Sequence, residues 1–327
     1  MKLSIKTESW PIKGHFSISR SSLTDVELVL VEILDGQVIG RGECRPYSRY
    51  NETAQSVIEQ IEHIRREIES GLSVKELQKL LPAGAARNAV DCALWDLRCK
   101  TEGRSVWDII GQVKPAPKDT AFTLSCDTPS AMAKAAVQAS MFNILKLKVD
   151  AQRITEQIEA VAKVRPKSRF IIDANEDLKA ADVYTLAAHV NAPQIALIEQ
   201  PLHDNIVRNH SFHDYTGPPL CADESFHGIE NLEPLKALGY KAVNIKLDKC
   251  GGFTAAMHLI SEAKKHGFMT MSGCMLSTSL SVAPMAVIMD MFDIIDLDGG
   301  ALLERDRAYG LKYEKGKVHP PLANLWG

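Results

Sequence analysis

Residues 144–149 read ILKLKV, a short apolar strand interrupted by two lysines, and similar runs recur along the chain at a nearly constant spacing of about 25 residues. The runs are TAFTLS near 122, ILKLKV near 147, FIIDA near 172, IALIEQ near 198, LCADES near 222, AVNIKL near 245, FMTMSG near 270 and DIIDLD near 295. Longer amphipathic stretches separate them. Eight strands alternating with helices at this period predict a closed (β/α)8-type TIM barrel over residues 116–303. An open doubly wound sheet would show the same alternation, but no glycine-rich phosphate loop follows the first strand.

The first part of the chain has a different pattern, which predicts an α+β capping domain over residues 1–115. Residues 26–34 are mostly β-branched and aliphatic, Asp35 and Gly36 supply a hairpin turn, and a second strand starts at Val38. Helical spacing of apolar residues follows over 53–70 and 85–100. The segment 304–327 has little helical pattern, and we expect it to return to the capping domain.

The composition and net charge of the chain narrow the classes of ligand to be expected. The chain has 327 residues, 45% of them hydrophobic and 24% charged, with a formal net charge of −3, as in ordinary globular proteins. This charge gives no reason to expect binding to nucleic acid or to a membrane surface, so we expect a small-molecule ligand. The sequence is compatible with a homo-oligomer.

The termini and cysteines indicate a reducing compartment. Seven cysteines lie scattered without paired spacing, and the first residues, MKLSIKTESW, contain no apolar run of the signal-peptide kind. We therefore predict a cytoplasmic protein. Residues 268–289 carry no charge, but they include Gly273, Pro284 and several serines and threonines, which favours a strand, a loop and a buried helix over a membrane span.

Polar side chains close most of the predicted barrel strands, at the edge where TIM barrels carry their active sites. They are Lys146 and Lys148 on the second strand, Asp173 and Asn175 on the third, Glu199 on the fourth, Asp223 and Glu224 on the fifth, Lys246 and Asp248 on the sixth, and Asp296 and Asp298 on the eighth. Residues two apart on a strand face the same side, so both lysines of the second strand should enter the barrel mouth.

Three of these carboxylates suggest a metal. Each alone could be a solvated loop residue or a helix cap. Asp173, Glu199 and Asp223 end three consecutive strands, however, and converging carboxylates repel one another unless a cation neutralises them. A hard divalent ion, one Mg²⁺ per subunit, is the expected occupant.

The lysines suggest proton transfer beside a carboxylate. Removing a proton from the carbon next to a carboxylate builds negative charge, which a metal ion and a nearby ammonium group can stabilise. We therefore predict Lys148 as a base, Lys146 as its electrostatic partner, and Lys246 as a second base on the opposite side of the barrel. Opposed bases can invert a stereocentre, because one takes the proton and the other returns one.

In this order, the residues resemble the enolase superfamily and its muconate-lactonizing subgroup. The matching motifs are KLK at 146–148, DAN at 173–175, EQP at 199–201, ADES at 222–225 and NIKLDKCGG at 244–252. RGECRPYSRY and LPAGAARNAVDCALWDL look like the capping domain of dipeptide epimerases. The resemblance implies a modified (β/α)7β barrel, Mg²⁺ on Asp173, Glu199 and Asp223, and Lys148 and Lys246 as paired acid/base catalysts. Asn175 and Glu224 would lie next to the metal ligands and support them without binding the ion.

The resemblance also implies a substrate class. The DLDG motif at 296–299 looks like the acidic pair with which dipeptide epimerases hold the substrate's α-ammonium, so Asp296 and Asp298 are expected substrate-binding residues. L-Ala-D/L-Glu, a dipeptide of murein metabolism, is the leading substrate. A cation expected in the loop around 19–25 is replaced by Leu23, so either Arg20 or Arg45 substitutes, or the second residue of the dipeptide is not glutamate.

Three other functions stay open at this stage. One is a dipeptide epimerase with a different side-chain preference. Another is an enzyme of the o-succinylbenzoate synthase or muconate cycloisomerase type, against which the ammonium-binding acids argue. The remaining one is a non-catalytic barrel that binds a small carboxylate, for which we would expect a lysine or a metal ligand to be lost. A histidine-dependent racemase is disfavoured, because His266 precedes the seventh strand instead of ending it.

Overall fold

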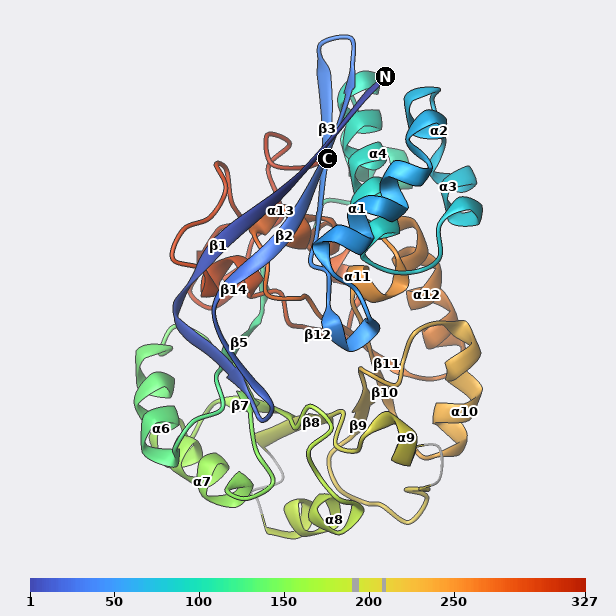
Figure 1. Ribbon diagram of the computed structural model, residues 1–327. Helices are drawn as coiled ribbons and strands as arrows, with labels where there is room; N and C mark the ends of the chain where they lie inside the picture. Colours follow the sequence, from blue (N-terminus) through green and yellow to red (C-terminus); the bar gives the residue numbers. More distant parts are fainter. Residues whose placement is uncertain (190–193, 208–209) are drawn as a thin grey trace.

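The computed structural model describes residues 1–327 except 190–193 and 208–209. An antiparallel sheet with the order β1-β2-β3 and a group of helices form one part, and an eight-stranded parallel barrel forms the other (Figure 1). The sheet comprises β1 (Lys2–Ile18), β2 (Ser21–Asp35) and β3 (Val38–Cys44). The predicted turn after Asp35 is confirmed, since Asp35 pairs with Val38 across Gly36, which has a positive φ of 59°.

The first two strands form a hairpin that extends beyond the capping domain. Its pairing runs from Lys2 and Leu34 to Ile18 and Ser21, with a register shift between Pro11 and Phe16. Figure 1 shows the hairpin leaving the capping domain and ending over the barrel, near the end of β7. Cap residues are therefore brought to the mouth of the barrel.

Helices cover one face of this sheet. They are α1 (Ala54–His63), α2 (Arg65–Glu69), α3 (Val74–Leu80) and α4 (Ala85–Glu102), and the short helix α5 (Val106–Ile110) packs against α4. The longest of them, α4, lies directly on β3. A Cβ atom at Gly42 would stand 2.0 Å from the carbonyl oxygen of Ala89, and one at Gly40 would stand 2.3 Å from that of Ala93. Glycine on the strand and alanine on the helix thus permit an approach that larger side chains would prevent.

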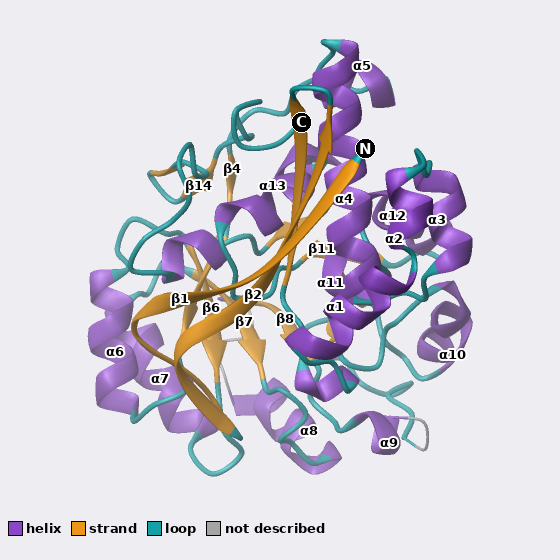
Figure 2. Ribbon diagram, turned by 45° about the horizontal axis from the view of Figure 1, so that its top comes forward, coloured by secondary structure: helices purple, strands orange, loops and turns teal. Residues whose placement is uncertain are grey.

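Eight parallel strands make the barrel, in the order β12-β11-β10-β9-β8-β7-β6-β5. Figure 2 draws the strands in orange and labels β6, β7, β8 and β11 of the barrel. The strands are β5 (Ala121–Leu124), β6 (Ile144–Lys148), β7 (Arg169–Asp173), β8 (Ile195–Glu199), β9 (Leu220–Ala222), β10 (Ala242–Ile245), β11 (Met269–Ser272) and β12 (Ile294–Ile295). Between them lie α6 (Pro129–Gln138), α7 (Ile154–Val164), α8 (Ala180–His189), α9 (Asp204–Val207), α10 (Leu232–Ala237), α11 (Leu247–Cys250), α12 (Phe253–Lys265) and α13 (Ser279–Val287). The predicted TIM barrel is confirmed.

Side chains close the seam between the first and last strands. Thr120 Oγ1 accepts a hydrogen bond from Leu297 N at 2.9 Å, and Asp298 Oδ2 accepts one from Thr123 N at 2.6 Å. No α-helix of the described chain follows β12, where a 3₁₀ turn (Gly299–Leu302) stands instead. This is the (β/α)7β form.

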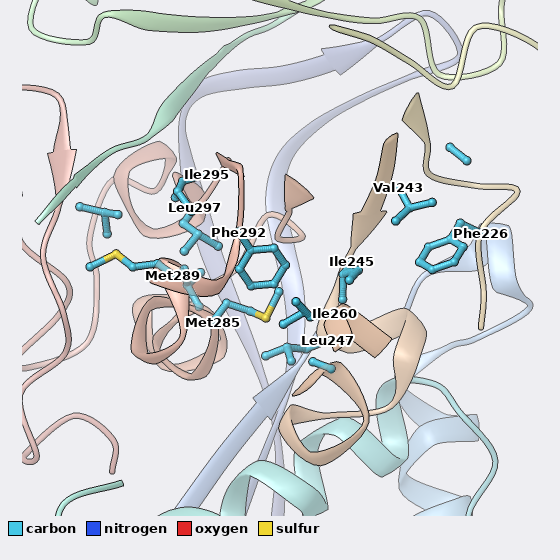
Figure 3. Close-up of a cluster of buried hydrophobic side chains, with 14 of the residues drawn as sticks. Phe226, Val243, Ile245, Leu247, Ile260, Met285, Met289, Phe292, Ile295 and Leu297 are labelled. Carbon is cyan, nitrogen blue, oxygen red and sulfur yellow. The ribbon is translucent and has the colours of Figure 1, made fainter. Parts of the chain in front are cut away.

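The hydrophobic core has two layers around the strands. Inside the barrel the layer consists of Ala121, Ile171, Leu197, Cys221, Ala242, Met271 and Ile294. Outside it, side chains of the strands pack against the surrounding helices, as Figure 3 shows for Val243 and Ile245 of β10, Ile260 of α12 and Met285 of α13. The filled interior leaves the strand ends as the place for a ligand.

The C-terminal segment crosses back to α4 and β3. Trp326 Nε1 donates to Cys92 O at 2.9 Å, Gly327 N donates to Asp96 Oδ1 at 2.9 Å, and Arg41 donates to the carbonyl oxygen of Leu325 at 2.8 Å. Among the described helices, none is both long enough and apolar enough to span a membrane.

Candidate active site

A cavity of about 470 Å³ lies between the hairpin, the segment after β3 and the barrel strand ends. Its lining combines cap residues with charged residues of the barrel. From the barrel come Thr123, Lys146, Lys148, Asn175, Asp223, Glu224, Lys246, Asp296 and Asp298, and from the cap come Phe16, Ile18, Leu23, Arg45, Tyr50 and Glu52, among others. The volume suits a small molecule of dipeptide size.

The two lysines of β6 point into this cavity and are buried. Lys146 Nζ lies 3.0 Å from Asp173 Oδ2, 2.8 Å from Glu199 Oε2 and 2.9 Å from Asp296 Oδ2. Lys148 Nζ donates to Asp173 Oδ2 at 2.5 Å. Burial acts to lower the pKa of Lys146, but the carboxylates of Asp296, Glu199 and Asp173 outweigh it and hold that pKa well above its ordinary value.

Strand register places the three predicted metal-binding carboxylates at the ends of three neighbouring strands. Asp173 pairs with Lys148 on one side and with Glu199 on the other, and Glu199 pairs with Cys221, two residues before Asp223. All three carboxylates are buried. Burial alone would raise the pKa of Asp173, but the ammonium groups of Lys148 and Lys146 lower it to about 2. For Glu199, burial and then the charge of Asp173 raise the pKa to about 8.

Two further lysines lie on the opposite side of the barrel. Lys246 Nζ, directly after β10, donates to Asp223 Oδ2 at 2.7 Å. Lys249, on the short helix α11, donates to Asp223 Oδ1 and to Asp223 O, both at 2.6 Å. Burial acts to lower the pKa of Lys246, but the carboxylate of Asp223 raises it above the ordinary value. The role of Lys249 was missed in the sequence, although it stands in the quoted motif NIKLDKCGG.

These groups leave an excess of negative charge that a divalent cation would neutralise. Six buried carboxylates (Asp173, Glu199, Asp223, Glu224, Asp296, Asp298) face four buried ammonium groups (Lys146, Lys148, Lys246, Lys249), an excess of two negative charges when all are ionised. Two buried oxygens, Glu224 Oε2 and Asn175 Oδ1, accept no hydrogen bond, and Glu199 Oε2 lies 2.8 Å from the ammonium group of Lys146. Oxygen donors of this kind are what Mg²⁺ binds. Within the described residues, no group of three acidic, histidine or cysteine side chains lies close enough together to hold a metal ion. Lysine ammonium groups contact the carboxylates of Asp173 and Asp223 instead.

The predicted ammonium-binding acids follow β12. Asp296 Oδ2 is bound to Lys146, whereas Asp296 Oδ1 is buried and accepts no hydrogen bond. Asp298 Oδ2 accepts the backbone N–H of Thr123 across the barrel seam. Burial and the neighbouring charge of Asp296 raise the pKa of Asp298 to about 7. The sequence did not show that one of these two acids also closes the barrel.

Asn175 and Glu224 lie beside the metal-binding candidates. Asn175 N donates to Asp173 Oδ1 at 3.1 Å, and Asn175 Nδ2 donates to Glu224 Oε1 at 3.3 Å. Asn175 has a positive φ of 45°, which directs the chain away from β7 just after Asp173. Burial, followed by the charge of Asp223, raises the pKa of Glu224 to about 7.

The structure separates the three candidates for recognition of the substrate side chain. Arg20, at the hairpin tip, donates to Asn175 O at 2.6 Å and lies 3.3 Å from Glu176 and 3.5 Å from Glu224. Leu23 pairs with Phe16 and lines the cavity as part of an apolar wall. Arg45 lines the cavity from the segment after β3.

Comparison with known proteins agrees with this geometry. Residues 1–111 match the mandelate racemase/muconate lactonizing enzyme N-terminal domain, and residues 130–324 match the enolase C-terminal domain-like family. The chain belongs to the enolase superfamily. L-Ala-D/L-Glu epimerase of Escherichia coli K12 is 39% identical over 316 residues, which are 95% of this chain and 97% of that protein.

Two other similar proteins complete the comparison. N-acetyl-D-glutamate racemase of a Pseudoalteromonas species is 40% identical over 303 residues, 92% of this chain and 95% of the relative. An enolase family member of Agrobacterium tumefaciens with homology to dipeptide epimerases, solved with sodium and L-Ala-L-Glu and with an ordered loop, is 40% identical, covers 99% of both chains and has a TM-score of 0.93. This enolase superfamily member is therefore an isomerase of the epimerase and racemase class, related to the dipeptide epimerases.

Proposed function

We propose that this protein epimerises the glutamate of a dipeptide, with L-Ala-D/L-Glu as the substrate, by proton transfer between two lysines. The observation that carries the proposal is the placement of Lys148 and Lys246. They end β6 and β10, which are separated by three strands in either direction around the barrel, and both line the same cavity. A substrate bound between them presents opposite faces of its α-carbon to the two ammonium groups.

Each lysine acts as acid or base according to the direction of the reaction. In one direction Lys148 removes the α-proton as a neutral amine, and Lys246 donates a proton to the other face of the carbon; in the other direction the roles exchange. The enediolate formed between the two steps carries extra negative charge on the substrate carboxylate. Lys146, which contacts Asp173, Glu199 and Asp296, lies where its ammonium group can stabilise that charge.

The donor set of Asp173, Glu199 and Asp223 fits a divalent cation, which we propose to be Mg²⁺. Bound there, the ion would polarise the substrate carboxylate and so make the proton on the α-carbon more acidic. Lys148 and Lys246 now donate hydrogen bonds to carboxylate oxygens of Asp173 and Asp223. Burial acts to lower the pKa of Lys246, but the carboxylate of Asp223 outweighs it and raises that pKa. Withdrawal of these oxygens from the lysines would allow one lysine to lose its proton.

The acids after β12 favour a substrate with a free amine. Asp296 Oδ1, which is buried and accepts no hydrogen bond, is an acceptor for the α-ammonium of a dipeptide. The solved relative from A. tumefaciens contains L-Ala-L-Glu, and the E. coli relative acts on the same dipeptide by name. Murein peptide metabolism would supply such a substrate.

An N-acyl glutamate is the second candidate substrate. One relative, 40% identical, is an N-acetyl-D-glutamate racemase. In addition, the raised pKa of Asp298, about 7, allows this acid to be neutral near physiological pH, and a neutral acid suits an acyl group better than an ammonium group. Both candidates share glutamate at the reacting position.

Incubation in deuterated water separates the candidates. The purified protein with Mg²⁺ is offered L-Ala-L-Glu, L-Ala-D-Glu and N-acetyl-D-glutamate, and ¹H NMR follows exchange of the glutamate α-proton while chiral chromatography follows configuration. We expect exchange with inversion for the dipeptide, at a kcat/KM at least about tenfold above that for N-acetylglutamate. Exchange of N-acetylglutamate alone would assign the second candidate. No exchange with any substrate would refute both.

A further inference from the structure

Arg45 is the cation that the proposed chemistry does not use. It follows β3 and lines the cavity on the side of the capping domain. The barrel cations in the lining, Lys146, Lys148 and Lys246, each lie within 4.0 Å of a carboxylate oxygen. Among the described residues that line the cavity, Arg45 is the one cation without such a neighbour.

The backbone of Arg45 is fixed relative to the catalytic strands. Arg45 N donates to Asp248 Oδ1 at 3.1 Å, and the same oxygen accepts from Asn88 Nδ2 of α4 at 2.8 Å. Asp248 stands two residues after Lys246. The segment that carries Arg45 is thereby anchored beside the strand that carries one of the two proposed bases.

The guanidinium group is crowded, and Arg45 is one of the residues that line the cavity. Its central carbon lies 5.4 Å from the centre of the Tyr47 ring, so an aromatic face covers part of it. Burial lowers the pKa of Arg45, since the surrounding protein removes water from the cation. A partly desolvated guanidinium group with unpaired N–H donors attracts an anion strongly, and a carboxylate matches its fork of donors.

The substrate offers one group for this position. Around the reacting carbon, the lysines take the proton, the strand-end groups take the α-carboxylate, and Asp296 faces the amino end. The remaining substituent is the substrate side chain, which would lie against the part of the cavity that the capping domain lines. There the lining is apolar at Phe16 and Leu23, acidic at Asp25, Glu27 and Glu52, and, among the described residues, cationic only at Arg45.

We propose that Arg45 binds the side-chain carboxylate of the reacting residue and makes glutamate the preferred residue at that position. The inference rests on the proposed function and deepens it, because it assigns the specificity of the same site. It holds for Ala-Glu and for an N-acyl glutamate alike. Arg20 is not available for this role, since its guanidinium group already binds Asn175 O and lies next to Glu176 and Glu224.

Paired substrates that differ only in side-chain charge test the inference. L-Ala-L-Glu and L-Ala-L-Gln are titrated into Mg²⁺-loaded protein by calorimetry, and their α-proton exchange is measured for the wild type, R45M, R45Q and R20M. R104M serves as the matched control, because Arg104 is an exposed arginine far along the chain from the cavity lining. We expect the wild type to prefer Ala-Glu by about 100-fold in binding and in kcat/KM.

The variants separate the outcomes. R45M and R45Q should reduce the Glu/Gln ratio to less than about fivefold by lowering affinity for Ala-Glu while Ala-Gln turnover is kept, which also shows that they fold. R20M and R104M should keep the wild-type ratio. An unchanged ratio in R45M and R45Q, a ratio lost in R20M, or a wild type that binds both dipeptides equally would each overturn the inference. Selective binding of Ala-Glu without any exchange would refute the proposed function and leave the role of Arg45 standing.

Discussion

Asp223 accepts hydrogen bonds from two ammonium groups, Lys246 at Oδ2 and Lys249 at Oδ1. Burial acts to raise the pKa of this carboxyl, but the two lysines hold it well below its ordinary range. Lys249 also donates to Asn244 O at 3.1 Å, so it is fixed to the strand and serves to keep Asp223 ionised and oriented. Lys249 thus donates to three acceptors, whereas the ammonium group of Lys246 donates to Asp223 Oδ2 and belongs to the lining of the cavity.

Removing either proposed base should abolish epimerisation while leaving exchange on one face. K148A and K246A should each lower kcat for inversion by about 10³-fold, because one of the two proton transfers loses its acid or base. One variant should still exchange the α-proton of the L-Glu epimer and the other that of the D-Glu epimer. ¹H NMR in deuterated water with each epimer of Ala-Glu measures this directly.

The control for these two variants is K134A on α6, where the lysine is exposed and remote from the cavity lining. It should retain wild-type exchange of both epimers. If K148A and K246A lost exchange with the same epimer, the two lysines would not serve opposite faces of the substrate, and the two-base mechanism would be wrong.

Several site residues could be predicted from the sequence because each ends a strand of the repeating pattern. Parallel strands bring their carboxyl ends to one edge of the barrel, so Lys146, Asp173 and Glu199 could be expected to lie close together there. Lys249 and Arg45 could not be placed in this way. Lys249 reaches back from α11, and Arg45 enters from the other domain, so both depend on tertiary packing that no periodicity records.

At the level of elements, the prediction failed where local signals conflict. No strand was predicted over residues 2–18, where Pro11 and Gly14 interrupt the pattern, yet these residues form the long strand β1 because β2 provides a partner over nearly its whole length. The helix predicted over 53–70 is divided at Ile64 into α1 and α2, since Ile64 has a non-helical ψ of 17°. Both differences are set by packing in the capping domain instead of by local propensity.

The tip of the β1–β2 hairpin should position the substrate without taking part in the chemistry. Arg20 attaches this tip to the loop after β7 through Asn175 O. R20A should raise KM for Ala-Glu and Ala-Gln alike by about three- to tenfold and change kcat by less than twofold, because the tip loses a charge-assisted hydrogen bond. Steady-state kinetics with both dipeptides measures this, and a drop confined to kcat would contradict it.

The contact between α4 and α12 should make stability depend on pH. Asp91 of α4 accepts hydrogen bonds from Thr254 N, near the start of α12, at 2.9 Å and from Gln78 Nε2 at 3.0 Å. Burial raises the pKa of Asp91 to about 6 from 3.8. The folded protein thus binds the proton more tightly than the unfolded chain, so the stabilisation is fully present below about pH 4 and is lost as pH rises through about 6.

D91N should remove this contribution, which is on the order of 2–3 kcal/mol in the free energy of unfolding. Urea denaturation of the wild type and D91N at a series of pH values gives the difference between them as a function of pH. That difference should change between about pH 4 and pH 7 and be constant on either side. D214N, at an exposed position, is the control, and a pH-independent difference for D91N would show that Asp91 does not titrate in this range.

For the whole molecule, the excess of buried negative charge predicts stabilisation by a divalent cation. At a Mg²⁺ concentration about 100 times its Kd, the free energy of unfolding should rise by about 2.7 kcal/mol, and EDTA should reverse the gain. D223N should weaken the effect, whereas D290N, at an exposed acid, should not. Thermal unfolding with and without Mg²⁺ measures the shift, and identical midpoints under both conditions would contradict the proposed metal site.

The two domains should unfold as one unit, because a buried ion pair joins them. Arg307 Nη2 lies 2.5 Å from Glu43 Oε2 and 2.6 Å from Glu8 Oε2, and Thr278 Oγ1 donates to Glu43 Oε2 at 2.7 Å. Glu43 belongs to β3, whereas Thr278 precedes α13 of the barrel. Burial raises the pKa of Glu43, and Arg307 opposes this. Loss of the arginine would therefore leave a buried carboxyl without its counter-charge.

R307M should lower the free energy of unfolding by about 3–5 kcal/mol, since breaking a buried pair costs more than replacing both partners. The double variant E43M/R307M should recover at least about half of the loss for the same reason. Scanning calorimetry should show one transition for the wild type and two for R307M, with the capping domain melting first, because the remaining links between the domains include single hydrogen bonds such as Thr254 N to Asp91 and Asn88 Nδ2 to Asp248. A single R307M transition within about 1 kcal/mol of wild type would show that apolar packing, and not this ion pair, holds the domains together.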